Sequence, residues 1–261
     1  MKQWIGLSEG LSRRGLRLVL VRAGVPSPWS ELCRALFEVK RIDYEQIDGR
    51  DPVAGLSLLK EKTSQESMPV AFWNDERPRA NWLELLQLAE RLGDEPRLLP
   101  DTCEERAQVT GLCAELCSEA GFGWHRRILL IHHMLTGDDM QERERRIGRY
   151  LAGKYGYQAN GLQHSAQRCE DIVATFARLH AARSEPSLYF NGRSLSALDL
   201  AWAAFAALIQ PLPHEQCPMS EVWRTLYTWQ PAQTSPDIVN ALLHRRDEIY
   251  AKHFSLPVIV A

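Results

Sequence analysis

A serine between a predicted strand and a predicted helix is the residue best suited to chemistry in this chain. Residues 16–21 form an apolar run rich in β-branched side chains, which is typical of a buried strand. Pro28 suits the first position of a helix, because its ring fixes φ and its missing N–H is not needed there, so Ser27 is expected at the N-cap. The backbone N–H groups of a helix start favour an anion, and a Ser27 hydroxyl could help to stabilise it. The alternative is that Ser27 only caps the helix.

The elements that position Ser27 form a predicted βαβ unit. The helix after Ser27 is expected to run to about Lys40, because apolar residues recur along it at helical spacing. Residues 44–47 then predict a second strand, which returns parallel to the first through a right-handed crossover. Ser27 should therefore stand at the carboxyl end of a strand and at the amino end of a helix.

A third predicted strand and a second amphipathic helix follow. Residues 68–73 read as a strand that carries Pro69 at its start, where a cis peptide bond can hold a sharp turn. Asn81 is the predicted N-cap of a helix over residues 82–92, and Gly93 is expected to end it.

Beyond a predicted linker at residues 96–101, every pattern in the chain is helical. An acidic cap by Asp101 is expected at the first of these helices. The clearest signal is a capping box, in which Ser196 precedes Asp199 by three residues and an apolar run follows that must be enclosed by other helices. The sequence thus predicts an α/β region over residues 1–95 and an all-helical region over residues 101–261.

Composition limits the class of function. The chain has 261 residues, 25% of them charged, with a formal net charge of −2, so no global positive field favours a nucleic acid partner. Paired arginines are scattered along the chain and are expected on solvated helix faces. The pairs are Arg13-Arg14, Arg126-Arg127, Arg145-Arg146 and Arg245-Arg246.

The N-terminal residues lack an apolar signal region, and the longest apolar stretch, 200–209, is too short to cross a bilayer, so a cytoplasmic protein without a membrane partner is expected. The six cysteines include no C-x-x-C motif and are expected to be buried thiols. Cys113 and Cys117 lie one helical turn apart, but no further ligand at metal-binding spacing accompanies them, so no metal is expected.

Taken in order, these motifs resemble those of the cytosolic glutathione transferases, and of a bacterial-like, serine-type subgroup in particular. The likeness spans nearly the whole chain and predicts a thioredoxin-like N-terminal domain followed by an all-helical C-terminal domain. It rests on five segments: Ser27-Pro28-Trp29-Ser30, Met68-Pro69-Val70, the helix start at Asn81, Leu98-Leu99-Pro100 and the capping box of Ser196 and Asp199.

The resemblance implies roles for four residues. Ser27 would activate the thiol of glutathione, the co-substrate, for attack on a small hydrophobic electrophile. Met68, followed by Pro69, would offer its backbone to the cysteinyl part of glutathione. Asn81 and the amides of the helix that it opens would receive the γ-glutamyl carboxylate. The resemblance also implies a homodimer.

One departure from the family pattern concerns glutathione binding. Ala80-Asn81 stands where the family usually has an acidic residue followed by serine, so the carboxylate that pairs with the ammonium of glutathione is absent there. Asp75 and Glu76 are nearby candidates to replace it. Arg77 and Arg79 could serve an anionic ligand or only the surface.

Two kinds of function follow from these residues. The first is a glutathione transferase that uses Ser27. Trp29, Trp73 and Trp124 are candidate walls of its acceptor pocket, although each of them fits a place in the apolar core as well. The second is a binding or interaction protein that keeps the fold without catalysis. A thiol–disulfide oxidoreductase is disfavoured, because Ser27 occupies the position of the attacking cysteine and Cys33 is expected to be buried.

Overall fold

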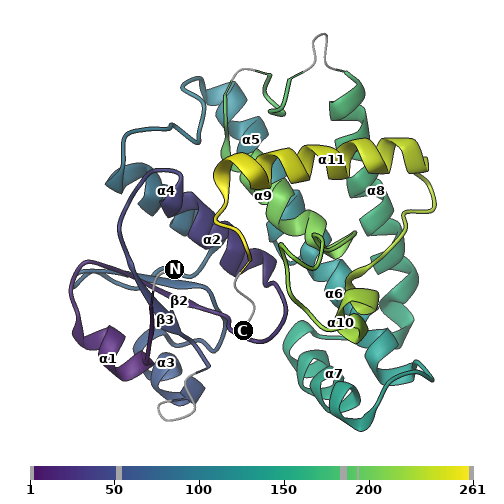
Figure 1. The fold of residues 1–261 in the computed structure, drawn as a ribbon, viewed down its shortest axis with the longest axis horizontal. Coiled ribbons are helices and arrows are strands. Elements are labelled where there is room, and N and C mark those ends of the chain that lie inside the picture. Colours follow the sequence, from purple (N-terminus) through teal and green to yellow (C-terminus); the bar gives the residue numbers. More distant parts are fainter. Residues whose placement is uncertain (1–2, 51–54, 183–186, 193, 259–261) are drawn as a thin grey trace.

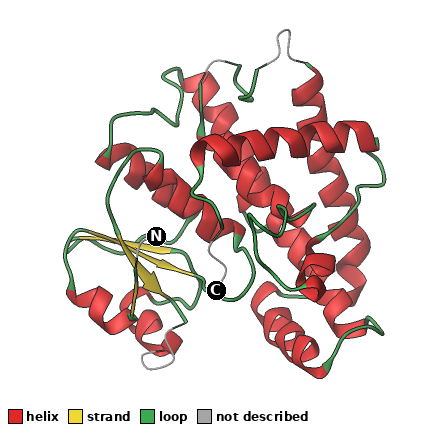
Figure 2. Cartoon of the chain, in the orientation of Figure 1, coloured by secondary structure: helices red, strands yellow, loops and turns green. Residues whose placement is uncertain are grey.

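A four-stranded sheet forms the first part of the molecule. The structure is a computed structural model that describes residues 3–50, 55–182, 187–192 and 194–258. The strands lie in the order β1-β3-β2-β4, with β4 antiparallel to the other three. Figure 1 labels the two central strands, β2 and β3, and Figure 2 draws the sheet in yellow. Their bounds are β1 Trp4–Ile5, β2 Leu16–Leu20, β3 Glu45–Asp48 and β4 Val70–Trp73.

Two helices cover each face of this sheet (Figure 1). Helices α1 (Leu7–Ser12) and α3 (Gly55–Thr63) enclose a small apolar core with alternate sheet residues such as Val19 and Ile47. Helices α2 (Pro28–Glu38) and α4 (Trp82–Leu92) cover the other face, where Leu18 joins the larger core shared with the helical part. The alternation of buried faces along β2 follows from the two-residue period of a strand.

The predicted βαβ unit is confirmed. Strands β2 and β3 are parallel, with Leu18 opposite Gln46, and α2 connects them. Strand β1 and helix α1 were not predicted, because a strand of two residues and a helix of six carry too little periodic pattern. After β4 the chain turns back for a single antiparallel bridge between Ala71 and Arg79, in place of a further strand.

Seven α-helices make up the rest of the described chain. Their bounds are α5 Cys103–Cys117, α6 Phe122–Thr136, α7 Glu142–Tyr155, α8 Leu162–Ala181, α9 Ala197–Phe205, α10 Glu221–Tyr227 and α11 Pro236–His253, with short 3-10 turns at Ala159–Gly161 and Ala206–Leu208. Helix α9 lies at the centre and packs against α2, α5 and α11. Every residue of α9 is buried, and the predicted capping box of Ser196 and Asp199 is formed.

Two expectations for the helical part are wrong. The cap of α5 is Thr102, whose hydroxyl accepts a hydrogen bond from the backbone N–H of Glu105, and not Asp101. Two of the four arginine pairs are also not on solvated helix faces. Arg126, Arg127, Arg245 and Arg246 are all buried, three of them donating to backbone carbonyls.

The expectation of buried thiols is confirmed for five of the six cysteines and is wrong for Cys103, which is exposed; all six are free thiols. Among the described residues, no helix is both long and apolar enough to cross a membrane. Within that same part of the chain, no group of three or more histidine, cysteine or acidic residues could hold a metal ion.

Candidate functional site

Ser27 stands where the sequence predicts it, at the N-cap of α2 and beyond the carboxyl end of β2. Its backbone is extended, and its carbonyl accepts the first helical hydrogen bond from Glu31. Its hydroxyl makes no capping bond and has no hydrogen-bond partner among the described residues, although the side chain is half-buried. Ser27 is therefore the N-cap residue of α2 by its backbone, while its hydroxyl does not cap the helix.

The Met68-Pro69 peptide is cis and lies, like Ser27, beside the carboxyl end of β2. Strand β4 starts at Val70 directly opposite Val19, so the residues before it continue past the carboxyl end of β2. The side chain of Met68 fills the space above Gly49, where an added Cβ would come within 1.8 Å of the Met68 sulfur. Antiparallel pairing of β4 with β2 therefore brings two segments predicted to bind glutathione, some forty residues apart in the sequence, to one edge.

Asn81 caps α4 as predicted. Its Oδ1 accepts a hydrogen bond of 2.9 Å from the backbone N–H of Leu83. Glu84 lies in the first turn, close to the backbone N–H groups of Ala80 and Asn81. Against partial burial, the ion pair with Arg77 and these two N–H groups hold the pKa of Glu84 below its usual value. The backbone N–H of Leu83 at this helix start is thus already used by the Asn81 side chain.

The acidic candidates near Ala80 are engaged elsewhere. Glu76 lies 2.5 Å from Arg79 and 2.6 Å from Arg91, and these two hydrogen bonds, that of Arg91 first, lower its pKa. Asp75 pairs with Arg14 at 2.7 Å, beyond the far end of β4. Arg77 and Arg79 each serve a carboxylate of their own surroundings, which fits a structural role for both.

Aromatic side chains from several helices gather beside the start of α2. The ring of Trp29 lies 5.0 Å from that of Phe205 and 6.5 Å from that of Tyr155, while Trp124 lies 4.7 Å from Tyr155. Trp29 also donates from its indole nitrogen to the carbonyl of Cys117 at 2.8 Å. Trp73 does not belong to this group. It ends β4 opposite Leu16, at the end of the strands away from Ser27.

Arg127, in α6, was missed as a site residue. It is 8% exposed, and none of the ion pairs among the described residues involves it. Its guanidinium donates to the Tyr227 hydroxyl at 2.8 Å, while Tyr227 donates at 2.9 Å to the carbonyl of Pro26. The Tyr227 hydroxyl thus connects the buried positive charge of Arg127 to the turn that carries Ser27. No sequence signal separates Arg127 from its neighbour, because its partner is a hundred residues away.

A second cation lies beside this one. Lys154, near the end of α7, has a lowered pKa because of desolvation and the nearby charges of Arg127 and Arg50.

Cys33, five residues after Pro28 in α2, is fully buried, and burial raises its pKa well above the ordinary range. A thiolate at Cys33 is therefore disfavoured, as predicted for a chain without redox use of this residue.

Three solved structures, all glutathione transferases, illustrate the similarity to known folds. The one from Xanthobacter autotrophicus is 14% identical, with a TM-score of 0.59 over 93% of this chain and 96% of that one. The one from Methylobacterium radiotolerans, in complex with glutathione sulfonate, is 18% identical, with a TM-score of 0.57 over 92% of each chain. The one from Methylobacillus flagellatus, with glutathione bound, is 14% identical, with a TM-score of 0.56 over 91% of this chain and 95% of that one.

No sequence profile of a known protein family matches this chain, and no curated protein matches it in sequence. At identities of 14–18% the likeness to the solved structures is one of fold. The chain therefore has the fold of the glutathione transferases, a thioredoxin-like domain followed by a helical domain.

Proposed function

We propose that this protein is a glutathione transferase-like enzyme in which the Ser27 hydroxyl activates the thiol of glutathione for attack on a small electrophile. The observation that carries the proposal is the half-buried Ser27 hydroxyl, which the described residues leave unbonded at the start of α2. In the solved structures from Methylobacterium radiotolerans and Methylobacillus flagellatus the same fold binds glutathione sulfonate and glutathione.

The free energies involved are adequate for this role. Lowering a thiol pKa from about 8.5 to about 6.5 requires roughly 2.7 kcal/mol of preferential stabilisation of the thiolate. One hydrogen bond to a charged group supplies about 1.5–3 kcal/mol, and a helix N-terminus adds about 0.3–1 kcal/mol. Arg127 supplies a further positive charge close to the turn. Ser27 with these neighbours can therefore make a bound thiol nucleophilic at neutral pH.

In the proposed complex, glutathione lies along the edge that holds Ser27 and Met68. The backbone of Met68, turned by the cis peptide to Pro69, would pair with the cysteinyl residue of glutathione. The γ-glutamyl carboxylate would approach the helix start at Asn81, and the electrophile would lie against Trp29 and Trp124. The thiol gives up its proton to solvent, the thiolate sulfur forms a bond to carbon, and the leaving group departs with the electron pair of its own bond.

The experiment combines binding and turnover. Glutathione at a hundred times its dissociation constant should stabilise the protein by about 2.7 kcal/mol, which a thermal melt detects. Ser27→Ala should reduce transfer to an aryl halide at least tenfold while this stabilisation persists. Ser235→Ala is the matched control, because Ser235 also precedes a proline at a helix start and makes no capping bond. Equal activity of Ser27→Ala and the unmodified protein would contradict the role of Ser27.

A second candidate is a non-catalytic binding protein of the same fold, and one observation favours it. Asn81 already accepts from the backbone N–H of Leu83, and Glu76 is held by two arginines, so the expected γ-glutamyl site is partly occupied by the protein itself. The absence of any stabilisation by millimolar glutathione would favour this candidate over the enzyme.

A further inference from the structure

A pocket lies between the two parts of the molecule, beside the proposed glutathione site. It has a volume of about 470 Å³, within the usual range for small-molecule sites. One wall is formed by the end of α3 and residues 64–67, and the other wall by the last turns of α7. These two helices belong to different parts of the molecule and lie at the same end of it (Figure 1). Ser67 lines the pocket and directly precedes Met68, so the pocket adjoins the segment proposed to hold glutathione.

Lys154 carries the unpaired charge of this pocket. Among the described residues that line the pocket, Glu66 is the one acid, and it pairs with Lys60 at 2.9 Å. Lys154 is exposed, and none of the ion pairs among the described residues involves it. The charges of Lys60 and Glu66 offset each other, so the ammonium of Lys154 leaves the pocket with a surplus positive charge.

Two further cations lie near Lys154. Desolvation, and next the like charges of Arg127 and Arg50, lower the pKa of Lys154, whereas the charge of Glu66 raises it. Within the described part of the chain, Arg127 and Arg50 also take part in none of the ion pairs. Lys154 thus has two cations of like charge near it, and a bound anion would reduce the repulsion between them.

Aromatic rings connect Lys154 to the turn that carries Ser27. The Nζ atom of Lys154 lies 6.0 Å from the centre of the Tyr155 ring. The Tyr155 ring in turn lies 4.7 Å from that of Trp124 and 6.5 Å from that of Trp29, which is two residues after Ser27. An aromatic electrophile that reacts beside Ser27 can therefore pack against these rings and direct a substituent toward Lys154.

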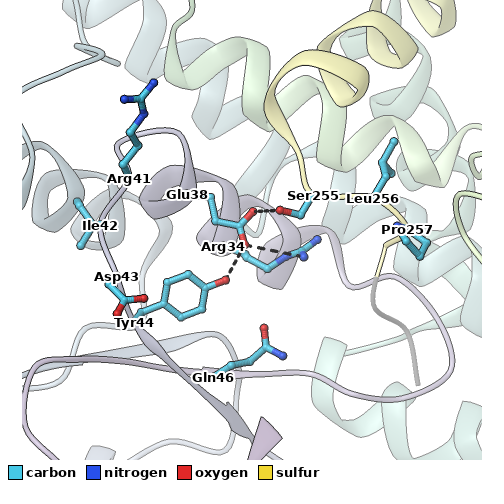
Figure 3. A pocket seen from close by; sticks show the side chains of 10 residues that line it. All are labelled: Arg34, Glu38, Arg41, Ile42, Asp43, Tyr44, Gln46, Ser255, Leu256 and Pro257. Atoms are coloured by element: carbon cyan, nitrogen blue, oxygen red, sulfur yellow. Dashed lines mark hydrogen bonds and ion pairs between the residues drawn. The ribbon is translucent and has the colours of Figure 1, made fainter. Parts of the chain in front are cut away.

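A second pocket of the same volume has a different charge balance. It lies at the other end of α2 from Ser27, beside Gln46, and the C-terminal segment forms part of its wall (Figure 3). The buried guanidinium of Arg34 lies 2.6 Å from Glu31 and 4.0 Å from Glu38. One positive charge faces two carboxylates there, so the pocket at Gln46 does not attract an anion as the pocket at Lys154 does.

We propose that the electrophile of this protein is an aromatic compound that carries a carboxylate, with its ring against Trp29 and Tyr155 and its carboxylate paired with Lys154. The inference rests on the proposed transferase function, because it names the substrate class of that site. Lys154 is then a specificity-determining residue, and the charges of Arg50 and Arg127 add to the attraction of the anion.

Ligands without a leaving group test the anion site separately from turnover. The pair 3-nitrobenzoate and 3-nitrobenzamide shares a nitrophenyl ring and differs in charge. Titrated by calorimetry into the full-length protein, with and without glutathione, 3-nitrobenzoate should bind at least tenfold more tightly than 3-nitrobenzamide. Equal affinities, or no saturable binding of 3-nitrobenzoate at millimolar concentration, would overturn the proposal.

Turnover of the corresponding aryl chlorides tests the same preference in the reaction. With 4-chloro-3-nitrobenzoate and 4-chloro-3-nitrobenzamide, the thiolate forms a bond to the ring carbon that bears chlorine, and chloride leaves with the electron pair. Each kcat/KM is divided by the uncatalysed rate constant of the same compound, because the two rings differ in reactivity. The quotient should be at least tenfold higher for the benzoate, and equal quotients would contradict the proposal. If neither compound is turned over while 3-nitrobenzoate still binds preferentially, the transferase function fails and the anion site stands.

Variants assign the preference to Lys154. Lys154→Met should raise the dissociation constant of 3-nitrobenzoate about tenfold and leave that of 3-nitrobenzamide unchanged, whereas Lys154→Arg should retain the preference. Arg146→Met, at an exposed position of the same helix outside the pocket, is the matched control. If Lys154→Met instead weakens glutathione binding and leaves 3-nitrobenzoate binding intact, Lys154 holds a carboxylate of glutathione and the proposal is wrong.

Discussion

At the scale of single residues, the environment of Ser27 depends on side chains distant in sequence. Tyr227 donates to the carbonyl of Pro26 and accepts from Arg127, so α6 and α10 place a positive charge beside the start of α2. The guanidinium also lies 5.0 Å from the centre of the Tyr227 ring. Since a positive charge favours a thiolate over a thiol, Arg127 should assist Ser27.

Replacing Arg127 tests this electrostatic role. Arg127→Met keeps much of the apolar volume and removes the charge, so the apparent pKa that controls kcat/KM for glutathione transfer should rise. The lost hydrogen bonds should also lower the free energy of unfolding by about 1–3 kcal/mol. A pH profile of kcat/KM separates the two effects, because a purely structural loss would leave its midpoint unchanged. Exposed Arg143→Met serves as the control for charge removal.

At the scale of elements, the capping box of α9 creates a pH-sensitive point in the core. Asp199 is fully buried and accepts hydrogen bonds from Ser196 and from the backbone N–H of Phe190. Burial nevertheless raises the pKa of Asp199 to about 6. Helix α9 packs against α2, which covers the sheet, and against α5 and α11 of the helical part. A change at the start of α9 therefore affects the core shared by both parts.

The sign of the pH effect follows from this shift. Between the ordinary pKa of an aspartate and about 6, the folded protein binds more protons at Asp199 than the unfolded chain does, so the free energy of unfolding should fall as the pH rises through that window. Chemical denaturation should show this slope in the unmodified protein and in Asp237→Asn, an exposed first-turn control. The slope should be absent in Asp199→Asn, whatever its constant loss of stability.

A close contact between elements involves Gly123 near the start of α6. An added Cβ would lie 2.3 Å from the ring of Phe205 in α9 and 3.0 Å from Trp29 in α2. Gly123→Ala should therefore destabilise the protein by about 1–3 kcal/mol. Gly111→Ala in α5, where no atom lies within 4 Å of the added Cβ, should be neutral or slightly stabilising in the same denaturation experiment. Similar losses in both variants would argue against close packing as the cause.

At the scale of the whole molecule, the two parts are joined by specific contacts. Lys40 donates to the carbonyls of Gly93 and Pro96, and Ala197 donates to the carbonyl of Leu98. The predicted linker is therefore hydrogen-bonded both to the first domain, through Lys40, and to the helical part, through the start of α9. The domain division at residues 95 and 101 stays a prediction. The C-terminal segment adds a further contact, from Ser255 to Glu38 in α2.

The oligomeric state is a prediction at this scale. A two-fold homodimer is expected from the resemblance to the transferases, with the first domain of one subunit against the helical domain of the other. Sedimentation velocity at micromolar concentration should give about twice the mass of 29.8 kDa. A single species of monomer mass would contradict this expectation.

The sequence by itself determined the local features, because their signals lie within a few residues of one another. The strand and helix around Ser27, the caps at Asn81 and Ser196 and the order of the two parts could all be predicted in this way. Strand β1 could not, since two residues carry no period. The fold resemblance depended on combining several such weak signals in the right order.

The tertiary structure alone decided what surrounds these features. Whether Ser27 uses its hydroxyl for capping depends on side-chain geometry, and the burial of Arg127 depends on Tyr227, a hundred residues away. The pocket at Gln46 likewise requires the end of the chain to return to α2. Short-range hydrogen bonds leave a pattern in the sequence, whereas contacts between distant segments arise only when the whole core packs.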